Sequence, residues 1–97
     1  MNTYIMLANY TEEGIQGVKQ TSERIEAGRA LAKEHDGEVK DIYLAMGIYD
    51  VVMIAQFPDA EAAAKFALRV GAMGHLRTTT LQAFPEDQYR AIAASLP

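Results

Sequence analysis

The chain has 97 residues, of which 49% are hydrophobic and 23% are charged, and its formal net charge is −4. This length allows one domain, and an acidic chain without a basic stretch argues against a nucleic-acid partner. The absence of cysteine excludes disulfides, thiol redox chemistry and thiolate metal sites. No apolar run reaches the roughly 18 residues of a membrane span. We therefore expect a single domain over residues 1–97, cytoplasmic and without a membrane partner.

The first half of the chain predicts a strand, a helix and a second strand. Residues 3–10 have strand composition, and Thr11 before Glu12 and Glu13 is typical of a helix N-cap. Apolar or small residues then recur every three or four positions as far as Gly37, which is the period of an amphipathic helix. These residues are Ile15, Val18, Ser22, Ile25, Gly28 and Leu31. Residues 38–46 predict the second strand.

The second half predicts a hairpin, a helix, a strand and a last short helix. Gly47 and Ile48 form a short turn, so residues 38–46 and 49–57 should pair as an antiparallel hairpin. Pro58-Asp59 caps a helix that ends near Gly74, and residues 75–84 form the fourth strand. Pro85 at a first helical position begins the last helix. The order βαββαβ indicates an α+β, ferredoxin-like fold with a four-stranded antiparallel sheet and two helices on one face, plus a short C-terminal helix.

Both faces of the predicted sheet are apolar. Tyr4 and Met6 alternate with Ile5 and Leu7, and residues 51–57 repeat the pattern. Two helices cover only one face, and monomers rarely expose such a patch. We therefore expect a homodimer or higher oligomer through the sheet face, with the C-terminal helix folding over that face as the alternative.

Several segments resemble the GYD domain family. They are the hairpin Gly47-Ile48-Tyr49-Asp50 with Val51-Val52, the segment Phe57-Pro58-Asp59, residues 74–84 and the opening strand. The resemblance extends from about residue 3 to residue 93. It implies a dimeric α/β barrel, and it implies neither an established activity nor a set of catalytic residues.

Four polar residues are candidates for a binding site. Tyr49 and Asp50 follow the predicted turn, where they could handle a proton at a pocket mouth or serve the turn, with Asp50 accepting backbone N–H bonds. His75 and Arg77 share one strand face by alternation. They could bind a small anion or polarise a carbonyl; the alternative is a surface histidine and an arginine in an inter-chain salt bridge.

The sequence predicts no cofactor and no metal site, because it offers two histidines, no cysteine and no Gly-rich phosphate loop. Another group of residues could line an apolar cavity for a small apolar ligand or simply fill the core: Tyr4, Tyr10, Tyr43, Met6, Met46, Met53 and Phe66. The sequence leaves two functions open. One is an oligomeric domain that binds a small molecule or a protein partner. The alternative is a cofactor-independent enzyme, monooxygenase- or isomerase-like, acting on a small apolar or aromatic substrate.

Overall fold

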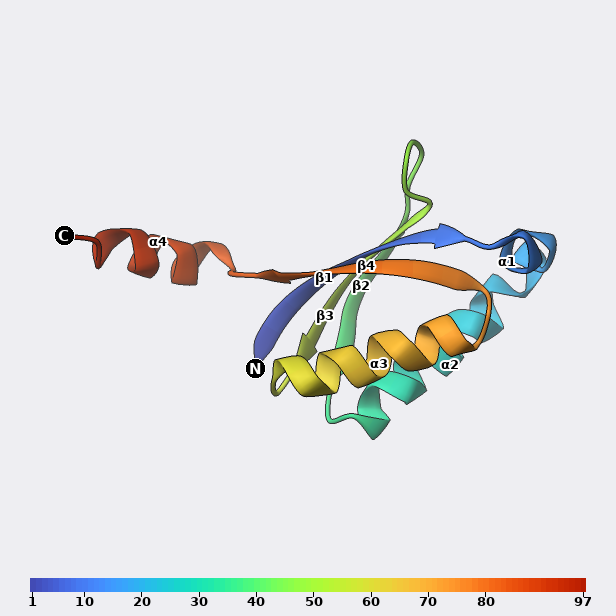
Figure 1. Ribbon diagram of the computed structural model, residues 1–97, viewed down its shortest axis with the longest axis horizontal. Helices are drawn as coiled ribbons and strands as arrows, with labels where there is room; N and C mark the ends of the chain where they lie inside the picture. The colour runs from blue at the N-terminus through green and yellow to red at the C-terminus, as the bar shows by residue number, and fades with distance from the viewer.

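The computed structural model describes residues 1–97 and contains one four-stranded antiparallel sheet (Figure 1). Its strands are β1 (Asn2–Tyr10), β2 (Glu38–Leu44), β3 (Val51–Phe57) and β4 (Leu76–Ala83). The spatial order is β2-β3-β1-β4, so the first and third strands are central and every neighbouring pair is antiparallel. This arrangement confirms the predicted ferredoxin-like α+β fold.

The helices are α1 (Glu12–Gln16), α2 (Thr21–Glu34), α3 (Ala60–Ala72) and α4 (Glu86–Ala94), with a 3₁₀ turn η1 (Val18–Gln20) between α1 and α2. None of them has the length and apolar character needed to cross a bilayer. The predicted caps are confirmed: the Thr11 side chain accepts from the Gly14 N–H, and the Asp59 side chain accepts from the Ala62 N–H.

The single helix predicted between residues 12 and 37 is wrong, because the chain breaks at Gly17. This residue ends α1 with φ −97° and ψ 25°, which is not helical. A β-carbon at Gly17 would lie 2.2 Å from a terminal guanidinium nitrogen of Arg24. The glycine therefore interrupts the helix and at the same time leaves space for the Arg24 side chain.

The hydrophobic core lies between the sheet and the pair α2 and α3. The strand side chains in it come from one set of alternating positions, including Tyr4, Met6 and Phe57, and the opposite set faces away from the helices. Phe57, Phe66 and Met6 are the largest fully buried side chains. The apolar alternation predicted for β1 and β3 is confirmed, and the Tyr4 face is the one that meets the helices.

The connection between β2 and β3 is longer than the predicted two-residue turn. Strand pairing stops at Leu44 opposite Val51, and residues 45–50 form a loop that projects from the body (Figure 1). Gly47 has φ +132°, and Ile48 accepts a hydrogen bond from the Asn9 side chain at 2.7 Å. The base of the loop is held by a hydrogen bond from the Ala45 N–H to the Asp50 carbonyl at 2.7 Å and by these contacts with β1.

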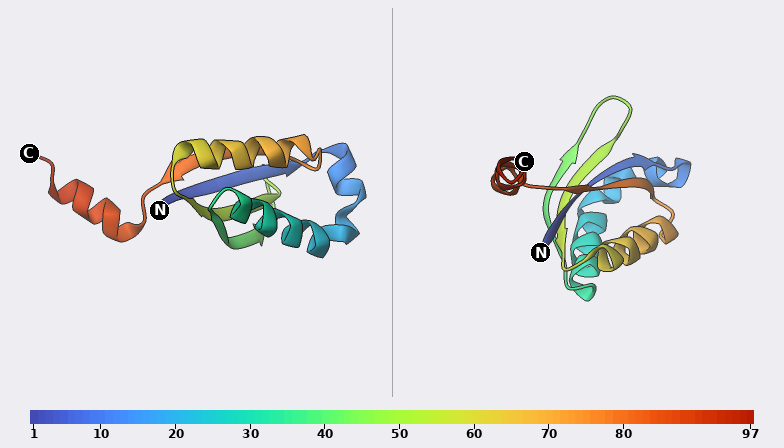
Figure 2. Two further views of the ribbon diagram at one scale, coloured as in Figure 1. Left: turned by 90° about the horizontal axis from the view of Figure 1, so that it is seen from below. Right: turned by 60° about the vertical axis from the view of Figure 1, so that its left-hand side comes forward.

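Helix α4 stands away from the domain. It continues beyond β4 as an arm, and every one of its residues is exposed (Figures 1 and 2). Large apolar side chains on the arm are therefore exposed: Tyr89 is 67% and Ile92 is 45% exposed. The alternative in which this helix folds over the bare sheet face is therefore wrong for the isolated chain.

Candidate functional site

The sheet face opposite the helices is apolar and uncovered. Both long helices lie on the other side of the sheet (Figure 2, right). Strand register aligns two rows of side chains across the bare face. One row runs Leu81, Ile5, Ile54, Asp41, and the other runs Thr79, Leu7, Val52, Tyr43. We call these eight residues the outer face; its centre, made by β1 and β3, consists of four aliphatic side chains.

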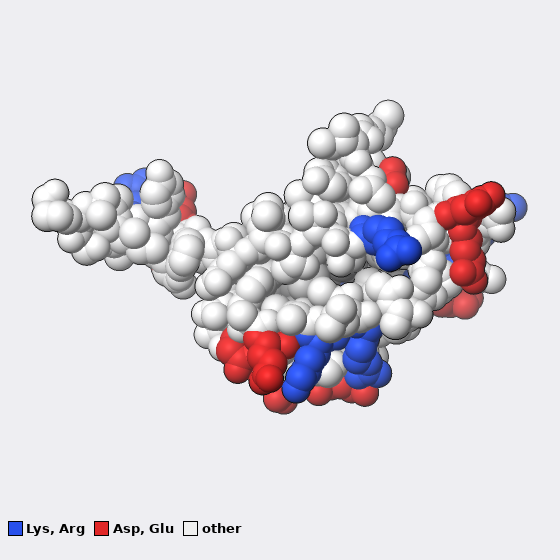
Figure 3. Space-filling view, viewed as in Figure 1, with Lys and Arg blue, Asp and Glu red and all other residues white.

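Apolar side chains are also exposed on the loop at residues 45–50. Met46 is 98% exposed and Ile48 is 85% exposed, so neither contributes to the core. In Figure 3 the tip of this loop is free of charge, with an acidic residue at its base and a basic residue over the strands, whereas most of the charged residues in view lie over α1 to α3. The chain therefore exposes apolar anchors at the end of its projecting loop.

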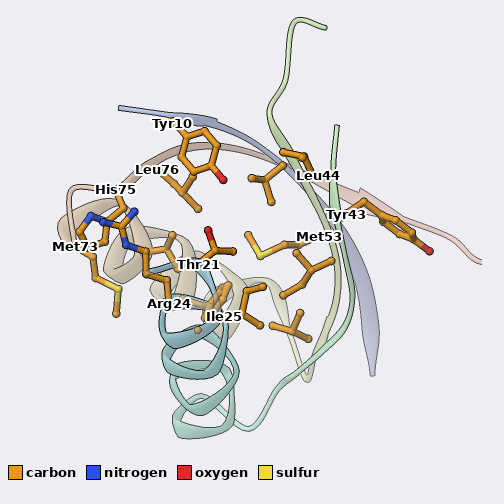
Figure 4. Close-up of a pocket in the computed structure, with 16 residues that line it drawn as sticks. Tyr10, Thr21, Arg24, Ile25, Tyr43, Leu44, Met53, Met73, His75 and Leu76 are labelled. Atoms are coloured by element: carbon orange, nitrogen blue, oxygen red, sulfur yellow. The ribbon is translucent and has the colours of Figure 1, made fainter. Parts of the chain in front are cut away.

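A cavity of about 230 Å³ lies between the sheet and the helices. Its wall is formed by α2, α3 and β2, by the end of β1 and by the starts of β3 and β4 (Figure 4). Twelve of its sixteen lining residues are hydrophobic. Of the residues for which the sequence offered a cavity or a core role, Tyr10, Met53 and Phe66 line this space. Tyr43 borders it, but its ring is directed away from the space (Figure 4), whereas Tyr4 and Met6 are core residues and Met46 is in solvent.

The polar groups of the cavity are Tyr10, Thr21, Arg24 and His75. Figure 4 shows the Tyr10 and Thr21 hydroxyls directed toward the space, and the nitrogens of Arg24 and His75 at one end of it. Gly14 lies next to both Arg24 and His75. Its carbonyl accepts a hydrogen bond from Arg24 at 2.8 Å, and a β-carbon on Gly14 would lie 2.0 Å from the His75 carbonyl oxygen. Arg24 is the only charged residue in the wall.

Asp50 is held by the backbone of β1. Its Oδ2 accepts a hydrogen bond from the Tyr10 N–H at 2.9 Å, and its own N–H donates to the Ala8 carbonyl at 2.9 Å. Tyr49 is half-buried in the same loop, and neither residue lines the cavity. Of the two roles that the sequence allows for Asp50, these contacts match the role in the turn, in which the carboxylate accepts a backbone hydrogen bond.

Replacing Asp50 by alanine should lower the free energy of unfolding by about 1–3 kcal/mol, because the partly buried Tyr10 N–H loses its acceptor. Chemical denaturation measures this loss. Asp50→Asn keeps an acceptor oxygen at the same place and should lose less than half as much. Equal losses for the two variants would mean that the carboxylate charge, and not the hydrogen bond, stabilises the loop.

His75 and Arg77 lie on opposite sides of the sheet, so the prediction that they share a face is wrong. Regular alternation begins only at Leu76, and His75 lies before it with its ring in the cavity wall. Arg77 pairs with Asn9 in register and lies in a shallow polar depression that includes Glu12 and Glu13. Of the four candidate residues, the cavity therefore contains His75 and not Tyr49, Asp50 or Arg77.

Arg24, Thr21 and Gly28 line the cavity but are not among the candidate site residues that the sequence predicts. Gly28 stands on the predicted inner face of the helix, where an apolar side chain is the usual occupant. Arg24 is one helical turn before it and next to Ile25. The sequence signal for this site is the pair Gly28, a glycine within an otherwise apolar stripe, and Arg24, a cation four residues earlier. No group of three His, Asp or Glu side chains is arranged to hold a metal.

Comparisons with known proteins agree with this architecture. The model of the GYD domain family matches residues 4–93. A Thermus thermophilus protein, named glutamine synthetase and cystathionine beta-lyase binding protein, is 31% identical over 86 residues, which cover 88% of this chain and 90% of that protein.

Solved structures show the same fold at low identity. A crystal structure of a hypothetical protein from Pyrococcus horikoshii has a TM-score of 0.62 and 22% identity, and the match covers 89% of this chain and 93% of that one. A crystal structure of a protein from Thermus thermophilus has a TM-score of 0.54 and 24% identity, with 87% of this chain and 94% of that one covered.

Proposed function

The chain belongs to the GYD domain family, and on this premise we propose that it is a protein-binding module that works as a homodimer. The observation that carries the proposal is the uncovered outer face. Its four central residues, Ile5, Leu7, Val52 and Ile54, are aliphatic, and no element of the chain reaches them. An apolar patch of this kind on a small domain marks an interaction surface.

A second copy of the sheet is the occupant that fits the outer face best. A flat apolar sheet face is complementary to itself across a two-fold axis, and two such faces pack about 10 Å apart with interdigitated side chains. A stable interface buries roughly 800 Å² on each partner, so such a dimer would have to use most of the outer face. Because pairing would use the outer face, the loop at residues 45–50 would remain available to a different protein.

The second part of the proposal is that this loop binds a metabolic enzyme. The Thermus thermophilus relative is named for binding glutamine synthetase and cystathionine beta-lyase. Here, Met46 and Ile48 lie on a projecting loop and are almost fully exposed. Large apolar side chains in such a position are typical anchors of a protein interface, and methionine adapts to irregular partner surfaces.

The test is a binding titration with purified glutamine synthetase and cystathionine beta-lyase from the same organism. We expect the unmodified chain to bind at least one of them, and the double variant Met46→Ser, Ile48→Ser to bind at least about tenfold more weakly. Leu68→Ser is the matched control, because Leu68 is 74% exposed on α3, away from the loop. Absence of binding to both enzymes, or an unchanged affinity of the double variant, would contradict the assignment.

A further inference from the structure

We propose that the cavity between α2 and the sheet binds a small monocarboxylate with an apolar body and no amino group. Its carboxylate would be held by Arg24 and His75. This inference does not rest on protein binding by the outer face or the loop, because the cavity lies on the other side of the sheet.

Arg24 supplies an unused positive charge. One of its terminal nitrogens donates to the Gly14 carbonyl at 2.8 Å, and this is the only hydrogen bond that the guanidinium makes. The three salt bridges of the chain involve Lys40, Arg69 and Arg90, so Arg24 has no carboxylate partner. A guanidinium carries five N–H donors in a planar fork that matches a carboxylate. Most of these donors remain free in the half-buried wall of an apolar cavity.

His75 supplies a second donor at the same end. Its Nδ1 is the one buried side-chain nitrogen or oxygen atom of the chain that has no hydrogen-bond partner. Buried polar atoms are nearly always paired, and an orphan in a cavity wall calls for a partner from outside the chain. Because Nδ1 is buried in the structure described, the His75 ring would have to turn on ligand binding to present an N–H to one carboxylate oxygen while Arg24 donates to the other. The Tyr10 hydroxyl, which is directed toward the space, could donate as well.

The rest of the cavity defines the body of the ligand. Its wall is largely hydrophobic and its volume is about 230 Å³. An engineered apolar cavity of about 150 Å³ accommodates benzene, and sites for drug-sized ligands begin at about 300 Å³. The ligand is therefore about the size of a benzene ring with a short substituent, or of a short branched chain. No Asp or Glu lines the cavity, so an ammonium group would find no partner there.

Gly28 keeps this space open. It lies in the interior of α2 and lines the cavity, and a β-carbon built on it meets no atom within 4 Å. Glycine weakens a helix interior relative to alanine, and no close contact requires it at this position. The empty volume next to Gly28 is thus the part of the cavity that a side chain would remove first.

The experiment is a calorimetric titration of the full chain with phenylacetate, phenylacetamide and phenylalanine. Phenylacetate should bind at least tenfold more tightly than its neutral amide, and phenylalanine should bind more weakly than phenylacetate because its ammonium group is unpaired. Amide resonances of residues around Gly28 and His75 should shift on binding, whereas those of α4 around Ile92, which is far from the cavity wall, should not. Equal affinity for phenylacetate and phenylacetamide would overturn the proposal, and so would an absence of phenylacetate binding into the millimolar range.

Three variants test the assigned residues. Arg24→Gln should reduce phenylacetate affinity at least tenfold and leave phenylacetamide affinity unchanged, whereas Arg24→Lys should lose less. Gly28→Leu should abolish binding of both compounds without lowering the midpoint of thermal unfolding, because it fills space that is already empty. Arg77→Gln, on the other side of the sheet, is the control and should bind as the unmodified chain does. Full binding by a folded Gly28→Leu chain would place the ligand elsewhere.

Discussion

Replacing Ile54 by lysine is expected to convert the proposed dimer into a folded monomer. Ile54 lies at the centre of the outer face, opposite Ile5 on one side and Asp41 on the other. In a monomer the new ammonium group would reach solvent and could pair across the strands with Asp41. In a dimer the two-fold axis would bury two lysines near each other. Even with Asp41 beside each lysine, desolvating the charges and bringing two like charges together costs energy, and a cost of about 3 kcal/mol raises the dissociation constant more than a hundredfold.

The measurement is molar mass from light scattering during size-exclusion chromatography, over a range of protein concentrations. Leu68→Lys is the matched control, since it introduces the same charge at an exposed position on α3. This control should keep the mass of the unmodified chain. A monomeric unmodified chain would contradict the proposed dimer, and a dimeric Ile54→Lys chain would mean that pairing uses another surface.

Local patterns in the sequence were sufficient for most of the fold. Thr11 and Asp59 predict helix starts because a side-chain oxygen before a helix satisfies N–H groups only a few residues away. The alternation of Tyr4 and Met6 with Ile5 and Leu7 predicts a strand with two apolar faces. The pattern alone does not determine which face meets the helices, because both sets have the same period and the same polarity.

The cavity could not be predicted in the same way. Arg24, Gly28 and His75 come from α2 and from the start of β4, and only tertiary packing brings them to one space. The sequence predicts His75 as a site residue but places it with Arg77 on one strand face. That placement assumes that strand alternation includes residue 75, whereas β4 begins at Leu76. The length of the loop at residues 45–50 was missed for a related reason. Its form depends on bonds from Tyr10 and Asn9, which are distant in sequence.

The largest expected loss of stability follows from replacing Phe57 by alanine. The ring is 0% exposed and is surrounded by aromatic neighbours from two other elements. The Tyr4 ring of β1 stands edge-on with its centroid 6.1 Å away, and the Phe66 ring of α3 is tilted with its centroid 5.1 Å away. Gly37 lies so close that a β-carbon on it would meet the Phe57 ring at 2.3 Å. Phe57 thus fixes α3 and the end of α2 to the sheet.

Removing this ring should cost about 3–5 kcal/mol, which is a large part of the roughly 5–15 kcal/mol available to a small domain. Urea denaturation should be measured in the Ile54→Lys chain, so that unfolding is not coupled to dissociation. Phe84→Ala is the control, because Phe84 is 55% exposed between β4 and the arm and should change stability by less than about 0.5 kcal/mol in that chain.

The same control also tests the arm. If Phe84→Ala is neutral in the monomeric chain but destabilises the unmodified chain, the partner copy covers Phe84. The arm that contacts nothing in one chain would then be part of the interface with the second. If Phe84→Ala is neutral in both chains, the partner copy does not cover Phe84. If Phe84→Ala lowers the free energy of unfolding of the monomeric chain by several kcal/mol, the exposed position of Phe84 is contradicted.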